Sequence, residues 1–248
     1  MLLQDKVAIV SGASRGIGRQ TALTLAWHGA SLVISGTKVD LLNEVAGKVN
    51  EMGRKCMVSV GDVTNFETAT KVVSQAIKEY GHIDILINNA GMNMRTSTLD
   101  MDIEDWKKVM DVNLNGNIYF CKAVLPYMIK QNYGKIVNVS STTAKSGHKN
   151  AIPAYGASKA GIDYLTKHLA IEMAEYNIYV NGVSPGPVET DMIKQWSDEY
   201  YQTVVSKIPL KKLGKPQNVA DVILFLASFM SDFITGETIN INGGTYMN

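Results

Sequence analysis

The chain has 248 residues, 46% of them hydrophobic and 19% charged, so it can build a large core and carries too little charge to stay disordered. Its 24 basic and 23 acidic residues leave a net charge of +1, which argues against a nucleic-acid or membrane partner bound by electrostatics. At this length a core alone suffices for stability, without disulfides or metal ions.

The cysteines and the apolar runs indicate the compartment. Cys56 and Cys121 stand far apart and lack metal-ligand spacing, so we expect reduced thiols and no metal site. The apolar stretch Val7–Val10 follows so closely on the start that no signal peptide fits. The longest apolar runs, such as Val222–Ala227, are much shorter than the roughly 20 residues of a membrane helix. These features predict a cytoplasmic protein.

Short β-rich runs alternate with helical stretches along the chain. The expected strands are Val7–Val10, Ser31–Ser35, Met57–Val60, Ile83–Ile87, Lys135–Val139, Ile178–Val183 and Thr238–Ile241. The expected helices are Ile17–His28, Asp40–Met52, Phe66–Tyr80, Ile103–Gln131, Ala154–Ala174 and Asn218–Phe229. Because most of the strands are continuously apolar and the connections are short, the pattern predicts an α/β fold. We expect one domain, residues 1–248, with a Rossmann-type, doubly wound parallel sheet flanked by helices.

One segment, Glu189–Lys212, interrupts this alternation. It contains Trp196, Tyr200 and Tyr201 with few β-branched residues and favours helix. Because ligands of α/β sheets bind at the carboxyl ends of the strands, an insertion there is a natural lid. An ordinary pair of surface helices is the alternative.

A glycine-rich turn follows the first strand. It reads Ser11-Gly12-Ala13-Ser14-Arg15-Gly16-Ile17-Gly18. Glycine permits a tight strand-to-helix turn and a close approach of the backbone to a pyrophosphate, and the helix N-terminus offers free N–H groups to the phosphates. The candidate phosphate-binding residues are Gly12, Ser14, Arg15, Gly16, Ile17 and Gly18.

The glycine spacing, Gly-x₃-Gly-x-Gly, is followed by Asn88-Asn89-Ala90-Gly91, Tyr155-x₃-Lys159 and Pro185-Gly186. In this order and at these distances the motifs resemble the short-chain dehydrogenase/reductase family over nearly the whole chain. Within it the chain looks most like the 3-oxoacyl-acyl-carrier-protein reductases, through Gly186–Met192 and the ending Ile234–Gly244. The resemblance implies a nicotinamide-dependent oxidoreductase that interconverts a ketone and a secondary alcohol, most similar to enzymes of fatty acid biosynthesis that reduce 3-oxoacyl thioesters.

The end of the second strand bears on the choice of cofactor. An acidic residue there would bind the adenosine ribose and favour NAD, but the chain has Gly36-Thr37-Lys38. Lys38 and Arg15 could meet a 2′-phosphate, which predicts NADP(H) in preference to NAD(H); plain solvation of both side chains is the alternative. The resemblance implies further cofactor contacts from Asp62, Val63, Asn89, Ala90, Gly91, Pro185, Gly186, Val188 and Thr190.

Tyr155 and Lys159 are the candidate reacting groups. Four residues apart on one helix, they project from the same face, and we expect the ammonium to lower the tyrosine pKa so that the phenol exchanges a proton with the substrate oxygen. Ser141, at the end of the strand Lys135–Val139, could polarise the carbonyl. Ser140 competes for this role. The resemblance selects Ser141, although its separation from Tyr155 is one residue longer than is usual in the family.

The resemblance adds roles for other groups. Lys159 would bind the nicotinamide ribose, and Asn113 would support a water-mediated proton path to that lysine; by itself Asn113 could equally bend or cap its helix. His148, in the lengthened substrate loop, could contact substrate or simply be exposed. The family also implies a homotetramer in which the helices Ile103–Gln131 and Ala154–Ala174 pack across one two-fold axis.

The substrate is less well indicated than the chemistry. Carrier-protein reductases commonly present basic residues at two helix ends where this chain has Asn132 and Tyr176; Lys130 and Lys135 could substitute. A free ketone, sugar, polyol or steroid is therefore an alternative substrate. A cofactor-binding sensor without turnover is a remote alternative, because a sensor would not need Ser141, Tyr155 and Lys159 together.

Overall fold

The computed structural model describes residues 1–149, 151–190 and 196–247. In them seven parallel strands form one sheet in the order β3-β2-β1-β4-β5-β6-β7. The strands are β1 (Val7–Ser11), β2 (Ser31–Gly36), β3 (Cys56–Val60), β4 (Ile85–Asn88), β5 (Gly134–Val139), β6 (Ile178–Pro185) and β7 (Thr238–Ile241). All seven predicted strands are present, and their ends differ by no more than two residues from the prediction.

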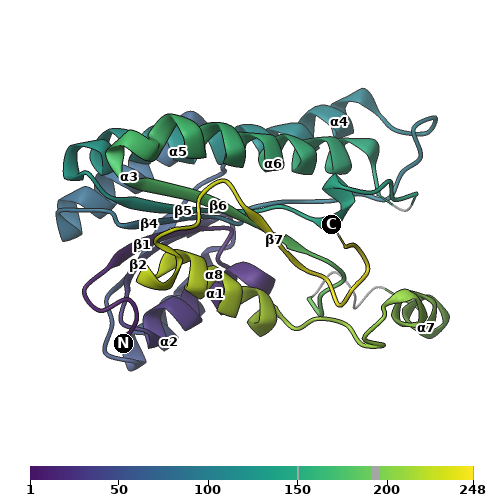
Figure 1. Cartoon of the computed structure of the whole chain (residues 1–248), viewed down its shortest axis with the longest axis horizontal. Coiled ribbons are helices and arrows are strands. Elements are labelled where there is room, and N and C mark those ends of the chain that lie inside the picture. The colour runs from purple at the N-terminus through teal and green to yellow at the C-terminus, as the bar shows by residue number, and fades with distance from the viewer. Residues whose placement is uncertain (150, 191–195, 248) are drawn as a thin grey trace.

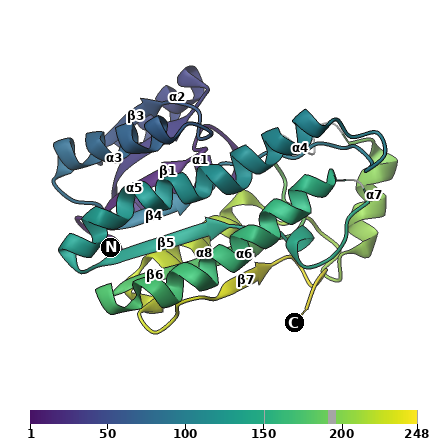
Figure 2. The ribbon, with the colours of Figure 1, turned by 90° about the horizontal axis from the view of Figure 1, so that it is seen from above.

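Helices cover both faces of the sheet (Figure 1). On one face lie α3 (Phe66–Tyr80), α5 (Gly116–Gln131) and α6 (Pro153–Met173), and on the other α1 (Gly16–Trp27), α2 (Val39–Glu51) and α8 (Pro216–Ala227). Figure 2 shows α4 (Ile103–Met110) and α7 (Asp198–Lys207) together at one end of the sheet. The prediction of a doubly wound parallel sheet between helices is confirmed.

The two faces of the sheet are buried in separate cores, which explains the continuously apolar strands. Ala8 and Val10 of β1 belong to one hydrophobic cluster, with residues of α1, α2 and α8. Ile9, between them in sequence, points to the other face and packs with residues of α3 and α5. Successive side chains of a strand point to opposite faces, so a strand covered on both sides is apolar at every position.

The predicted helix Ile103–Gln131 differs from expectation in its middle. The chain is helical throughout, but a π-helical segment, Asp111–Asn115, joins α4 to α5. Its wider turn contains the buried Asn113, whose side-chain amide bonds both backbone groups of Met92. These hydrogen bonds fix the segment to the loop after β4, and such π-bulges occur frequently at functional sites.

The strand order reverses between β1 and β4, which both extend toward the same edge of the sheet. The glycine turn follows β1, Asn89 follows β4, Ser141 follows β5 and Gly186 follows β6. The motif residues thus gather at the carboxyl edge, where ligands of such sheets bind.

Two further expectations concern the thiols and the membrane. Cys121 is buried, Cys56 is half-buried, and both are free thiols; burial raises the pKa of each to about 12. Among the described helices, none is both long and apolar enough to span a membrane.

Candidate active site

The turn between β1 and α1 has a conformation that two of its glycines require. Gly12 and Gly16 have φ angles of +63° and +55°, a region that residues with a Cβ rarely adopt. A Cβ at Gly12 would lie 2.7 Å from Ala90 Cα, and a Cβ at Gly18 would collide with the Gly12 carbonyl oxygen. The turn is therefore tight and lies directly against the end of β4.

The first N–H groups of α1 are available to an anion. Within the described chain, this helix has no side-chain cap at Arg15 and no acidic residue in its first turn. A cavity of about 630 Å³ adjoins the turn. Its described lining is Ser14, Arg15, Gly16, Arg19, Gln20, Leu41, Glu44, Glu189, Thr190 and Pro216. Free N–H groups at a helix N-terminus beside a bare glycine backbone suit a pyrophosphate, so these residues fit a dinucleotide cofactor.

Ser11 and Asn89 connect the ends of β1 and β4. Ser11 Oγ accepts hydrogen bonds from the N–H groups of Asn89 and Ala90, each at 3.1 Å. Asn89 Nδ2 in turn donates to the carbonyl oxygens of Ser11 and Gly12 at 3.1 and 3.0 Å. The Asn89 side chain therefore fixes the glycine turn. This structural role is additional to the cofactor contact that the resemblance implies for Asn89.

The end of β2 lies beside the glycine turn, as the cofactor prediction requires. A Cβ at Gly36 would be 4.0 Å from Ser14 Oγ, and the exposed Thr37 and Lys38 follow directly. Neither is part of the described lining of the 630 Å³ cavity. Their contact with a 2′-phosphate stays a prediction.

Arg19 and Glu44 line the cavity and were missed by the sequence analysis. Arg19 Nη2 lies 3.5 Å from Glu44 Oε1, and Lys48 Nζ lies 3.1 Å from the same oxygen. The hydrogen bond from Lys48 lowers the pKa of Glu44. Arg19 could have been found from its spacing, because four residues along a helix place it on the same face as Arg15.

Asp62 and Val63 follow β3 in different environments. Asp62 is exposed, and its Oδ1 accepts a hydrogen bond from the Thr64 N–H at 3.0 Å. Val63 is buried against Gly116, where a Cβ would lie 2.9 Å from Val63 Cγ2. The predicted contacts of both with adenine stay predictions.

The loop after β6 brings a second predicted cofactor segment to the glycine turn. Gly186 passes so close to the residue after β7 that a Cβ would lie 2.8 Å from Asn242 Cβ. Val188 is buried and pairs with Gly214, and Thr190 Cγ2 lies 3.4 Å from the position of a Cβ at Gly16. Thr190 thus joins the two cofactor segments. Asp191 and Met192, part of the resemblance, lie outside the described residues, as do 193–195 of the predicted lid.

Ser141 and Tyr155 meet at the carboxyl edge. The buried Ser141 hydroxyl interacts with the half-buried phenol of Tyr155, which it makes more acidic by lowering the phenol pKa. The same hydroxyl donates to Thr143 Oγ1 at 3.3 Å and accepts from the Thr143 N–H at 3.2 Å. Ser140 instead points its hydroxyl to the carbonyl oxygen of Lys159, at 3.2 Å, and interacts with the Asp163 carboxylate. Of the two serines, Ser141 is therefore the one beside the phenol.

The expected lowering of the tyrosine pKa was wrong for this structure. Burial raises the pKa of Tyr155, and the hydrogen bond from Ser141 only partly opposes it. Lys159 Nζ lies 5.8 Å from the centre of the Tyr155 ring and donates instead to the Val139 carbonyl oxygen, at 2.7 Å. Burial also lowers the pKa of Lys159, to about 8. Desolvation is therefore the main cause of both pKa shifts, and it favours the neutral form of each group.

Asn113, Lys159 and Gly91 lie together. A Cβ at Gly91 would be 3.4 Å from both Asn113 Oδ1 and Lys159 Nζ. Asn113 Nδ2 also donates to Ser158 Oγ at 3.0 Å, and that hydroxyl donates to the Tyr155 carbonyl oxygen. Ser158 is thus a supporting residue that the sequence analysis missed, inside the Tyr155-x₃-Lys159 motif.

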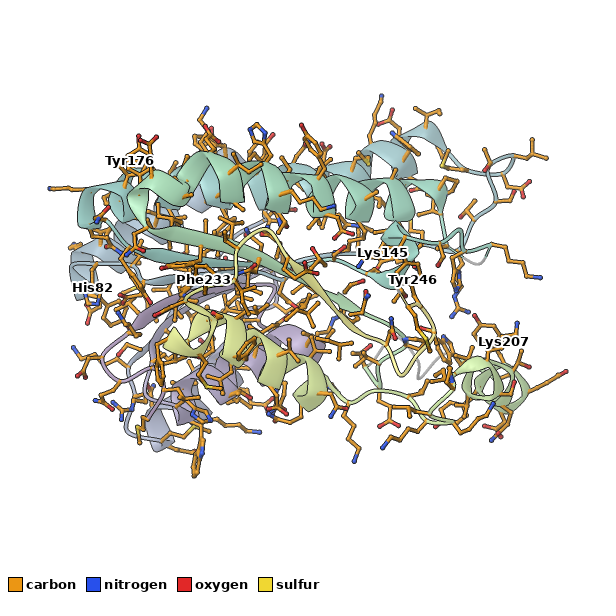
Figure 3. All side chains as sticks on the ribbon, in the orientation of Figure 1. His82, Lys145, Tyr176, Lys207, Phe233 and Tyr246 are labelled. Atoms are coloured by element: carbon orange, nitrogen blue, oxygen red, sulfur yellow. The ribbon has the colours of Figure 1, made fainter. Side chains whose placement is uncertain are left out.

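The loop between Ser141 and α6 is anchored by the C-terminal segment. Lys145 Nζ donates to Asn240 Oδ1 at 2.8 Å and lies 5.5 Å from the centre of the Tyr246 ring; Figure 3 shows Lys145 and Tyr246 beside each other. His148 is exposed in the same loop, and its contact with substrate stays a prediction.

Comparisons with known proteins agree with this geometry. Residues 12–246 match the family model described as Enoyl-(Acyl carrier protein) reductase. The 3-oxoacyl-[acyl-carrier-protein] reductase FabG of Thermotoga maritima is 41% identical over 98% of this chain and 99% of its own length. The trans-4-hydroxycyclohexanecarboxylate dehydrogenase of Sinomonas cyclohexanicum is 40% identical over 97% of this chain and 92% of its own.

Solved structures are similar over the same extent. A short-chain type dehydrogenase/reductase from Mycobacterium marinum superposes with a TM-score of 0.94 at 32% identity, covering 99% of this chain and 97% of that one. Levodione reductase has a TM-score of 0.94 at 27% identity, with 98% of each chain covered. With the glycine turn, Ser141, Tyr155 and Lys159 assembled on this sheet, the chain belongs to the short-chain dehydrogenase/reductase family of NAD(P)-dependent oxidoreductases.

Proposed function

We propose that the protein reduces 3-oxoacyl thioesters to 3-hydroxyacyl thioesters with NADPH. The observation that carries the proposal is the interaction of the Ser141 hydroxyl with the Tyr155 phenol, one helical turn from the buried Lys159. A hydroxyl pair of this kind at the carboxyl edge offers a substrate carbonyl oxygen two donors. The full-length similarity to 3-oxoacyl-[acyl-carrier-protein] reductases supports the choice of substrate.

The chain supplies the proton and the orientation. NADPH, when bound along the glycine turn, supplies the hydride that the carbonyl carbon accepts. Ser141 polarises the carbonyl oxygen, and Tyr155 donates its phenolic proton to that oxygen as negative charge develops there. The raised pKa of Tyr155 keeps the phenol protonated at neutral pH, as a proton donor requires.

Lys159 and Asn113 restore the proton that Tyr155 donates. Lys159 is 3% exposed, and with its pKa lowered to about 8 it exchanges a proton readily near neutral pH. Asn113 and the Lys159 ammonium both lie beside Gly91. In this proposal Asn113 positions the water molecules that return a proton to Tyr155 through Lys159.

The preference for NADPH over NADH rests on Arg15 and Lys38. Both are exposed beside the end of β2, where the described residues carry no carboxylate at positions 36–38 to repel a phosphate. Arg19 adds a third positive charge to the same cavity, although Glu44 partly balances it.

The test is a steady-state screen of NADPH and NADH oxidation with acetoacetyl thioesters of coenzyme A and acyl carrier protein. We expect turnover of the thioesters and a higher kcat/KM with NADPH. Arg15→Ala should lower kcat/KM for NADPH more than for NADH. A protein that binds NADPH but reduces no carbonyl compound of a broad panel would instead be a nucleotide sensor.

A second candidate substrate is an alicyclic hydroxy acid. The observation in its favour is the 40% identity to trans-4-hydroxycyclohexanecarboxylate dehydrogenase. The same screen therefore includes this acid with NADP⁺ and NAD⁺. A higher kcat/KM for the acid than for any thioester would make it the better assignment.

A further inference from the structure

A second cavity, of about 320 Å³, opens between the loop after β4 and the loop before α6. Its described lining is Arg95, Thr96, Ser97 and Lys149. Two of these side chains are cationic, two carry hydroxyl groups, and none of the described four is acidic. A lining of cations and hydroxyl donors suits a phosphate or a carboxylate.

The guanidinium of Arg95 is held in place without using its hydrogen-bond donors. Its Cζ lies 5.2 Å from the centre of the Tyr200 ring and 5.8 Å from that of Trp196. These two rings pack edge to face at 5.0 Å. An arginine stacked on aromatic rings is oriented by them while its N–H groups stay free for an anion.

The two cations of this cavity are unpaired within the described parts of the chain. There, neither Arg95 nor Lys149 forms an ion pair or a side-chain hydrogen bond. The buried indole N–H of Trp196 also lacks a partner among the described residues. The nearby carboxylates already have partners: Asp100 accepts from the Ser97 hydroxyl, and Asp102 caps α4. The Ser97 hydroxyl is therefore already bonded, whereas the described residues offer no acceptor to the two cations or to the indole N–H.

Short backbone links connect the cavity to the reacting centre. The Tyr155 N–H donates to the Ile152 carbonyl oxygen, and the Ile152 N–H donates to the Met94 carbonyl oxygen, each at 2.9 Å. Arg95 follows Met94 directly. Met92, Met94, Ile152 and Tyr155 share one apolar cluster, so an apolar surface extends from the phenol toward Arg95.

We propose that Arg95 and Lys149 bind an anionic group of the substrate, a phosphate or a carboxylate, while the carbonyl lies at Tyr155. The proposal rests on the proposed function, because it assumes that a carbonyl compound is reduced at Tyr155. The expected substrate has an oxoacyl group, an apolar stretch along the methionines and a terminal oxyanion. The phosphate of a phosphopantetheine arm and the carboxylate of an oxo acid both supply this chemistry.

The positions that the resemblance links to carrier-protein docking lie away from this cavity. Tyr176, one of the two positions where carrier-protein reductases present basic residues, is at the opposite end of the molecule from Lys145 (Figure 3). Lys135 is fully buried, and its Nζ lies 2.7 Å from Asp232 Oδ1, so it cannot substitute for a docking residue. The 320 Å³ cavity, by contrast, is linked to Tyr155 through Met94 and Ile152.

The test uses two pairs of ketones, each pair differing in one charge. The first pair is acetoacetyl-4′-phosphopantetheine and acetoacetyl-pantetheine, and the second is 4-oxocyclohexanecarboxylate and its methyl ester. For each pair the readout is the ratio of kcat/KM for the charged compound to that for the neutral compound. We expect a ratio of about 10 to 100 for one pair, which corresponds to about 1.4–2.8 kcal/mol and is in the range of a charge-assisted hydrogen bond. The pair that shows it identifies the source of the anion.

Variants then assign the ratio to the two cations. In Arg95→Gln and in Lys149→Gln the ratio should fall at least several-fold toward 1. Lys207→Gln, which removes an equal charge from α7 outside this cavity, should keep the wild-type ratio. Circular dichroism of each variant checks that the fold is retained.

Failure of this proposal and failure of the proposed function give different results. A wild-type ratio near 1 for both pairs, with turnover, overturns the anion site alone. If no thioester is reduced, calorimetric titration of the NADPH-loaded protein with 4′-phosphopantetheine and pantetheine decides. Tighter binding of the phosphorylated compound that is lost in Arg95→Gln supports the site, whereas equal binding of the two compounds overturns it.

Discussion

Tyr155→Phe removes one oxygen atom and tests the proton donor directly. The variant keeps the ring that packs against Ile152 and Met94, so it should fold and bind NADPH with a Kd close to that of the wild type. Turnover should fall by a factor of about 10² to 10⁴, as expected when a general acid is lost. Fluorescence titration of NADPH and steady-state assays measure the two effects. Parallel loss of binding and turnover would show that Tyr155 mainly holds the cofactor.

Lys159 combines a functional role with a cost in stability. Because burial lowers its pKa from 10.5 to about 8, the folded protein holds the ammonium less readily than the unfolded chain does. Lys159→Met removes this penalty and loses the hydrogen bond to the Val139 carbonyl oxygen. We expect the variant to be inactive and more stable at pH 7 by ~1–3 kcal/mol, measured by urea denaturation.

The stability gain of Lys159→Met depends on pH, because the pKa of Lys159 is lower in the folded protein than in the unfolded chain. Between pH 8 and 10.5 the unfolded chain binds more protons at Lys159 than the folded protein does, so wild-type stability rises with pH in this window. The advantage of Lys159→Met should be full below pH 8, shrink as the pH rises toward 10.5 and vanish above it. A difference that stays constant from pH 7 to 10 would mean that Lys159 is not desolvated in the folded protein.

At the scale of the elements, the crowded Gly18 at the start of α1 differs from the exposed Gly47 in the middle of α2. An alanine at Gly18 would collide with the Gly12 carbonyl oxygen and Asn89 Nδ2, whereas a Cβ at the exposed Gly47 meets no described atom within 4 Å. Gly18→Ala should destabilise the protein by about 1–3 kcal/mol and weaken NADPH binding. Gly47→Ala should stabilise it by about 0.5–1 kcal/mol without changing binding. Thermal unfolding and NADPH titration of both variants check this, and equal effects of the two would contradict the crowded turn.

The strands and most helices could be predicted from the sequence because their signals are local. Val7–Val10 is apolar at every position, as a strand buried on both faces must be. The π-helical segment at Asp111–Asn115 could not be predicted, because one widened turn leaves no compositional signal. The pair of hydrogen bonds between the Asn113 side chain and the Met92 backbone fixes this segment. The alternation of strands and helices along the sequence does not reveal such a contact between segments.

The same distinction applies to the site. Tyr155 and Lys159 were found through the resemblance of their motif to the family, and their spacing within one helix explains why they act together. Arg19 was within reach of the spacing argument. The cluster of Arg95 with Trp196 and Tyr200 joins the loop after β4 to the start of α7, about a hundred residues later, and only the folded chain brings these segments together. Strand order was likewise inaccessible from alternation alone, because short crossovers permit several orders.

For the whole molecule, exposed apolar side chains support the proposed homotetramer. Tyr164 and Ile171 on α6 are 66% and 82% exposed, and Phe229 and Phe233, which follow α8, are 65% and 104% exposed. These two pairs of apolar side chains, one on α6 and one after α8, are patches that suit the two kinds of two-fold contact in a tetramer with dihedral symmetry.

Each patch can be tested separately. Ile171→Glu and Phe233→Glu should each convert tetramers to dimers in light scattering at micromolar concentration. Leu99→Glu, which places the same charge on an exposed leucine outside both patches, serves as the control and should remain tetrameric. A monomeric wild-type protein would contradict the proposal.

The adjacency of β1 and β4 has a consequence for how the protein becomes active. Val10 pairs with Ile87, across two intervening strands and three helices, and Asn89 completes the glycine turn only once this pairing exists. Tyr155 and Thr190 then arrive with still later segments of the chain. Such pairings between distant segments form slowly. After dilution from denaturant, far-UV circular dichroism should therefore recover first, and turnover should return only in the final phase, when the last crossover closes.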